Sequence, residues 1–162
     1  MSKSFTLIEL LVTTTIILIF GGLSLAYYNN FTQERNLRNE ALKLVNILEL
    51  AKKKASSGDL SGLTCNGGFN GYRVNLTSSG YSLWLRCGGN SVSPAVFSYI
   101  FPSPSNISIT GEIGNYDFRE LNLTSTSETR TIQIKNSNIS KCLTITISSA
   151  GIITLSDNFI SC

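Results

Sequence analysis

An apolar run near the start of the chain constrains its fold more than any other feature. The run extends from Leu7 to Leu25 and holds one charged residue, Glu9. As an α-helix it would be roughly 28 Å long at 1.5 Å per residue, close to the ~30 Å hydrocarbon core of a bilayer. Lys3 is the only charged side chain before it. We therefore expect a single membrane crossing with a short cytoplasmic N-terminus.

The helical pattern continues beyond this run and becomes amphipathic. No proline interrupts the chain from Phe5 to Ser56, and Gly58 suits the left-handed cap that ends many helices. We predict one long helix, with residues 5–28 forming a transmembrane segment and residues 29–57 packed on the rest of the protein. Apolar residues at steps of three and four define the packed face: Leu37, Ala41, Leu44, Val45, Leu48, Ala51 and Ala55.

The chain after this helix has the patterns of β-structure. Residues 72–76 alternate, residues 78–80 form a turn, and residues 81–86 resume the alternation, which predicts a hairpin. Later strand-like runs are Tyr116–Arg119, Thr131–Lys135, Leu143–Ser148 and Ile152–Leu155, and Pro94, Pro102 and Pro104 mark loops or an edge strand. The predicted fold class is α+β, with the long helix packed on an antiparallel β-sheet head of residues 58–162.

Four cysteines all follow the apolar run, and none belongs to a C-x-x-C pair. They are Cys65, Cys87, Cys142 and Cys162. An even count in an exported region indicates two disulfides in an oxidising compartment, although the count alone allows three connectivities. The expected strand layout favours Cys65–Cys87, at the two ends of the first hairpin, and Cys142–Cys162, which would fix the tail to a late strand.

The composition excludes several kinds of site. The chain has no histidine, so Ser-His-Asp and Cys-His catalysis and histidine-based zinc sites are excluded. We predict no catalytic residue, metal or cofactor. The net charge is only +3, and Lys52, Lys53 and Lys54 suit the end of a helix better than a track for phosphates. A nucleic-acid partner is therefore not expected.

The segment from Lys3 to Val12, which reads Lys-Ser-Phe-Thr-Leu-Ile-Glu-Leu-Leu-Val, resembles the prepilin processing site of type IV pilins and type II secretion pseudopilins. The resemblance implies that a prepilin peptidase removes residues 1–4, cutting between Ser4 and Phe5, and methylates the new amine of Phe5. Ser4 departs from the glycine that is usual at this position.

Glu9 corresponds to the acidic residue of that motif. A carboxylate inside a membrane helix costs about 2.5–3.5 kcal/mol on insertion scales and marks function by default. In a filament, the amine of Phe5 on one subunit could approach Glu9 of its neighbour, so that two costly charges neutralise each other. We therefore predict that Glu9 sets the register between subunits during filament assembly.

The resemblance implies a structural role rather than an enzymatic one. The expected partners are the prepilin peptidase, other pilin or pseudopilin subunits and an inner-membrane assembly platform. The subunit would cross the inner membrane once, with its head in the periplasm or outside the cell, and then enter a filament. Residues 38–44 and 48–55 resemble the second half of the helix in GspH/FimT-like minor subunits, and residues 71–74 and 147–153 resemble their head strands. A minor subunit is therefore favoured.

Two alternatives stay open at this point. Some members of that branch bind DNA through a Gly-Arg-x-Arg stretch near the last hairpin, but residues 151–154 here contain no arginine. The chain could also be a monomeric signal-anchored exported domain, or carry an ordinary signal peptide cleaved after Ser24-Leu25-Ala26. In the head, Tyr81 and Trp84 are predicted to pack in the core, with binding of a partner as the alternative.

Overall fold

A computed structural model describes residues 6–60, 62–102, 106–119 and 128–162. Its first element is a single helix, α1 (Leu7–Ser57), of 51 residues. The helix begins after Thr6 with a capping box and ends at Gly58, whose left-handed backbone donates its N–H to the carbonyls of the last turn. The prediction of one uninterrupted helix is confirmed.

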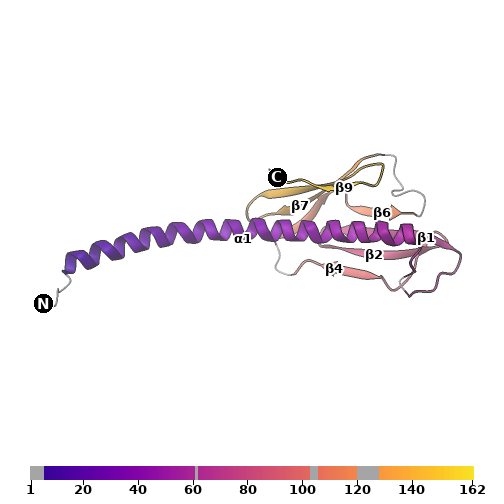
Figure 1. Ribbon diagram of the computed structural model, residues 1–162, viewed down its shortest axis with the longest axis horizontal. Helices are drawn as coiled ribbons and strands as arrows, with labels where there is room; N and C mark the ends of the chain where they lie inside the picture. The colour runs from indigo at the N-terminus through magenta and orange to yellow at the C-terminus, as the bar shows by residue number, and fades with distance from the viewer. Residues whose placement is uncertain (1–5, 61, 103–105, 120–127) are drawn as a thin grey trace.

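The two halves of α1 have different surroundings. The first half projects alone from the molecule, whereas the second half lies along the head (Figure 1). All described side chains between residues 7 and 31 are exposed. The face buried against the head is the predicted stripe, with Val45 at its edge: Leu37, Ala41, Leu44, Leu48, Ala51 and Ala55 are each 0% exposed.

The head contains two antiparallel sheets rather than one continuous sheet. The first has the order β3-β2-β1-β6, with β4 also paired to β2. The second has the order β10-β8-β7-β5, with β9 also paired to β8. The strands are β1 (Phe69–Thr77), β2 (Gly80–Cys87), β3 (Asn90–Ser91), β4 (Phe97–Ile100), β5 (Ile107–Gly111), β6 (Gly114–Phe118), β7 (Arg130–Asn136), β8 (Lys141–Ile147), β9 (Ile153–Leu155) and β10 (Ile160–Ser161).

One hydrophobic core joins α1 to both sheets. Alternate residues of each long strand point into it, as the period of two requires. From the first sheet, Val74 and Leu83 are fully buried, and from the second sheet Ile132 and Ile145 are fully buried. The helix therefore acts as the common surface on which the two sheets pack, and the opposite face of each sheet is left for other interactions.

Candidate functional site

The N-terminal motif is described only from Thr6 onward. Ser4 and Phe5 lie outside the described residues, so the predicted cleavage and methylation site stays a prediction. Glu9 is exposed in the first turn of α1. Its backbone N–H donates to the hydroxyl of Thr6 at 3.3 Å, and its carboxylate accepts from the backbone N–H of Thr6 at 3.5 Å. Glu9 therefore also caps its own helix, a role that the Thr6-x-x-Glu9 spacing signals and that sequence analysis missed.

The projecting half of α1 exposes mostly apolar side chains between residues 7 and 22. Among the described residues it is the one helix long and apolar enough to cross a membrane. Three successive threonines turn their hydroxyls back to the helix, since Thr13, Thr14 and Thr15 each donate to a backbone carbonyl three or four residues earlier. This bonding satisfies their donors without water, which suits lipid or a packed helical filament.

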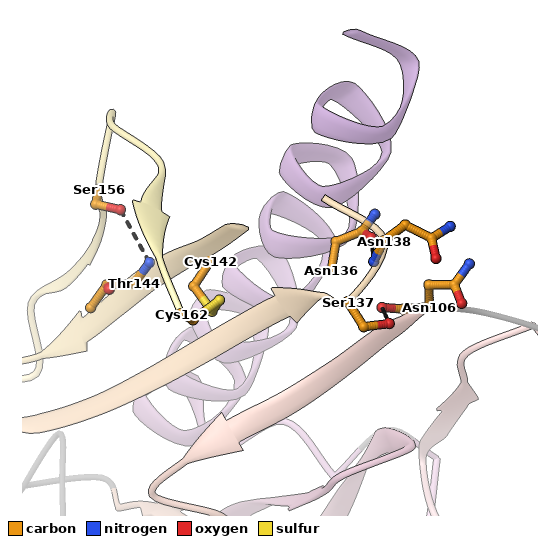
Figure 2. The surroundings of a disulfide bond; sticks show 8 residues. All are labelled: Asn106, Asn136, Ser137, Asn138, Cys142, Thr144, Ser156 and Cys162. Carbon is orange, nitrogen blue, oxygen red and sulfur yellow. Dashed lines mark hydrogen bonds between the residues drawn. A yellow bond between two sulfur atoms is a disulfide. The ribbon is translucent and has the colours of Figure 1, made fainter. Parts of the chain in front are cut away.

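Both expected pairs of cysteines are brought together. Cys65 joins Cys87 with a Cα–Cα distance of 5.5 Å, and Cys142 joins Cys162 at 5.9 Å. Figure 2 shows the second bond, where the last residue meets the start of β8. Phe159, near this bond, lies between two cations, the guanidinium of Arg38 at 5.8 Å and the amine of Lys141 at 5.6 Å from its ring. The C-terminal segment is thereby held against α1.

A buried amide ties the second sheet to α1. Asn136 is 0% exposed and donates to the side chain of Gln33 at 3.0 Å. Its own oxygen accepts from the backbone of Asn138 at 3.0 Å, in the turn shown in Figure 2. Lys141 pairs with Glu34, the residue that follows Gln33 in α1. This polar junction could not be predicted from the sequence, because an Asn before a turn is ordinarily a turn residue.

A groove lies where α1 leaves the head. Its volume is about 630 Å³, and its walls come from α1 between Gln33 and Asn46 and from the chain around Phe101 and Ile107. In it, one oxygen of Glu40 accepts from Lys43 at 2.7 Å and from Tyr99 at 3.2 Å, and the first of these bonds raises the pKa of Lys43. The other Glu40 oxygen is buried with no partner within the described part of the chain.

The outer face of the first sheet carries a charged cluster. Arg73 donates two hydrogen bonds to Asp117, at 2.6 and 2.8 Å, and Arg86 donates a third at 2.8 Å. Burial raises the pKa of the Asp117 carboxyl, but the bond from Arg73 and the charges of Arg86, Arg73 and Arg119 outweigh it and hold that pKa below its ordinary value.

Trp84 belongs to this outer face, so its predicted core packing is wrong. Tyr81 is buried in the core as expected, at 4% exposure. Trp84 stands three residues away on the same strand, and an odd spacing places two strand residues on opposite faces. Its ring is only partly covered.

The remaining candidates are groups of metal-binding side chains and the lysines at the end of α1. Among the described residues, no three His, Cys, Asp or Glu side chains are grouped as metal ligands. Lys52 donates to the carbonyl of Gly151 at 2.9 Å, and Lys54 pairs with Asp59. Two of the three lysines that end α1 are thus engaged within the molecule.

The fold defined by these elements is pilin-like: a long helix whose apolar first half projects and whose second half packs on an antiparallel head. No protein-family model matches the chain, and no curated protein is similar to it in sequence. A solved structure with this fold is the type IV minor pilin FimU of Pseudomonas aeruginosa. It matches with a TM-score of 0.58 and 16% identity, over 78% of this chain and 99% of the FimU chain.

Proposed function

We propose that this chain is a structural subunit, of the minor type, in a type IV pilus or a type II secretion pseudopilus. One observation carries the proposal: in the described part of the first half of α1, the side chains of residues 7–22 and 27–31 are all exposed, and the first of these runs is mostly apolar. Such a surface needs lipid or other apolar helices around it. The fold shared with a minor pilin supports the same conclusion.

The proposed life of the subunit has two stages. It first crosses the inner membrane once, with the head in the periplasm or outside the cell. The peptidase cuts between Ser4 and Phe5 and methylates Phe5. An assembly platform then transfers the subunit to a filament, where neighbouring helices replace lipid and Glu9 meets the amine of the next subunit. The chain itself performs no catalysis.

The groove beside Glu40 is a candidate surface for that assembly. It lies at residues 33–46 of α1, next to the segment that would enter the filament core. Its lining includes polar side chains of α1, among them Asn36, Asn39 and Asn46, which can donate to and accept from a neighbouring subunit.

Two measurements on one preparation test the proposal. The chain is produced in cells with a complete assembly machine, filaments are sheared from the cells, and the subunit is quantified in filaments and in membranes. We expect the subunit in the filaments, and we expect mass spectrometry of its N-terminus to find methylated Phe5. A head fragment without residues 1–31 is the control and should be absent from filaments. A mature chain that begins at Tyr27, or one confined to membranes, would contradict the proposal.

A further inference from the structure

The outer face of the first sheet presents two polar rows around a single aromatic ring. In the strand register, Trp84 on β2 lies opposite Arg73 on β1, and Arg73 lies opposite Asp117 on β6. The adjacent row consists of Ser82, Asn75 and Asn115 on the same three strands. Because residues opposite each other share a face, and residues two apart on a strand do too, all six side chains point away from the core.

Five of these side chains, together with Ser91, line an open depression of about 270 Å³. Its lining is Arg73, Asn75, Ser82, Trp84, Ser91 and Asn115. The volume lies just below the range of about 300–1,000 Å³ that is typical of sites for drug-sized ligands. The depression is therefore large enough for one monomer unit of a polymer whose other units extend into solvent.

The indole is fixed in place before any ligand arrives. Its Nε1–H donates to the hydroxyl of Ser82 at 2.8 Å, which sets the rotation of the ring. The amide of Asn75 donates to the carbonyl of Asn115 at 2.8 Å, so this pair is also aligned. That bond uses one donor and one acceptor, and it leaves the carbonyl of Asn75 and the amide of Asn115 for a ligand. A held ring and held amides reduce the entropy lost on binding.

Among the described residues, the one cation that lines the depression is already paired, so the charge there does not favour an anionic ligand. Arg73 is the cation that lines it, and Asp117 already binds Arg73 through both oxygens. Phosphate recognition requires cations whose charge is available. The other lining groups are amides and hydroxyls, which donate and accept hydrogen bonds and carry no charge.

We propose that the depression around Trp84 binds a neutral carbohydrate. A pyranose ring has a face of C–H groups, which are weakly positive and can lie on the negative face of an indole. Its hydroxyls both donate and accept, and therefore match the free carbonyl of Asn75, the free amide of Asn115 and the hydroxyl of Ser91. This binding does not depend on assembly into a filament, so its test and the test of filament incorporation can fail separately.

Trp84 is the only tryptophan in the chain, so its fluorescence reports on this depression alone. The full chain is held in micelles of an amine-oxide detergent, because detergents with sugar headgroups would compete. Cellohexaose, chitohexaose and maltohexaose are titrated at physiological salt, with oligothymidylate as the anionic comparison. We expect a saturable blue shift with at least one hexasaccharide and no shift with oligothymidylate.

Variants identify the site by calorimetry, which does not need the fluorophore. Trp84→Ala should weaken binding about tenfold or more, as expected when a stacking platform is removed. Asn115→Ala should weaken it several-fold, and because Asn115 is exposed its removal should not disturb folding. The matched control is Phe97→Ala, another exposed aromatic on the same sheet but outside the depression, which should bind as wild type.

Three results would overturn the proposal. They are the absence of a shift with all three hexasaccharides, undiminished binding by both Trp84→Ala and Asn115→Ala, and preferential binding of oligothymidylate that weakens with salt. If Trp84→Ala does not fold, Asn115→Ala and Ser82→Ala decide the question, since both keep the ring.

Discussion

At the scale of single residues, the carboxylate of Asp117 holds two arginines on the outer face of the first sheet. Its side chain is 12% exposed, and that of Arg86 is 9% exposed. Loss of this carboxylate would leave largely buried guanidinium groups without their acceptor, and the loss of hydrogen bonds to a charged group costs about 1.5–3 kcal/mol. Asp117 is therefore a structural requirement of the face that carries Trp84.

The first prediction follows from the low pKa of Asp117. An ordinary aspartate titrates near pH 3.9 in an unfolded chain. The folded pKa of Asp117 lies below that value. The ion pairs therefore stabilise the fold fully above the unfolded pKa, and this stabilisation is lost as the pH falls through the folded pKa. Asp117→Asn should lower the free energy of unfolding by about 1–3 kcal/mol at pH 7, and the difference from wild type should shrink below about pH 4.

Urea unfolding followed by Trp84 fluorescence at pH 7 and pH 3 measures this difference. The control is Asp157→Asn, because Arg38 bonds the backbone carbonyl of Asp157 and not its carboxylate. Equal effects of the two substitutions at pH 7 would show that the Asp117 ion pairs add no stability.

The second prediction separates the two roles of Glu9. A glutamine at the third position of a helix can complete a capping box as well as a glutamate can. Glu9→Gln therefore keeps the cap seen in the structure and removes the charge, whereas Glu9→Ala removes both. If the charge sets register between subunits, both variants should enter filaments far less than wild type, because the amine of Phe5 on a neighbour stays buried and unpaired.

The measurement is the ratio of mutant subunit in sheared filaments to that in membranes. Folding of the head and formation of its disulfides should be unchanged in both variants, since Glu9 has no contact with the head in the described structure. Normal incorporation of Glu9→Gln together with poor incorporation of Glu9→Ala would assign Glu9 to capping alone.

At the scale of elements, the first sheet depends on a close approach between two strands at Gly71. This residue has φ +98° and lies at an irregularity in the pairing of β1. A Cβ built there would stand 2.0 Å from the carbonyl oxygen of Phe118. The contact is with backbone, which cannot move aside without shifting β6.

The third prediction compares Gly71 with a glycine that has a similar φ and free space. Gly89 has φ +88° and nothing within 4 Å of a built Cβ. Gly89→Ala should cost only the backbone strain of about 1–2 kcal/mol. Gly71→Ala should cost more than about 3 kcal/mol, because a steric clash adds to that strain. Thermal unfolding of both variants checks the difference, and similar melting temperatures would contradict it.

The sequence predicts some of these elements well and others poorly. The stripe from Leu37 to Ala55 predicts the packed half of α1, because a helix that buries one face repeats its apolar residues over many turns. β4 and β5 were not predicted, since both are short and flank a proline-containing segment. Trp84 was wrongly predicted to lie in the core, because an aromatic residue in a strand is more often buried than exposed. Its face can be identified only from its odd spacing to Tyr81, which places the two residues on opposite faces of the strand.

At the scale of the whole molecule, two disulfides close loops of similar length in different sheets. Cys65–Cys87 spans 22 residues and ties the segment after α1 to the end of β2. Cys142–Cys162 spans 20 residues and ties the last residue to β8. The strand layout was sufficient to predict these pairs, whereas the division into two sheets was not predicted, because strand order depends on contacts between segments far apart in sequence.

The fourth prediction concerns these bonds. Replacement of Cys142 and Cys162 by serine should lower the free energy of unfolding by about 3 kcal/mol in the chain-entropy model. Hydrogen exchange should increase around β10 and remain slow in β1 and β2. The matched control is the replacement of Cys65 and Cys87 by serine. In that variant, hydrogen exchange should increase around β1 and β2 and remain slow around β10. Peptide mapping of the unreduced wild type that found Cys65 joined to Cys142 would refute the pairing.

The continuity of α1 gives the molecule a mechanical property. A helix of 51 residues is about 77 Å long at 1.5 Å per residue. No loop separates its projecting half from the half that packs on the head. A force applied to the head along the helix axis is therefore transmitted through the continuous helix to its N-terminal end. The helix is easiest to bend at Gly21-Gly22, because glycine has low helix propensity and, apart from the adjacent residues and the helix backbone, no described atom lies within 4 Å of a Cβ built at either residue. We expect bending of the helix to begin there.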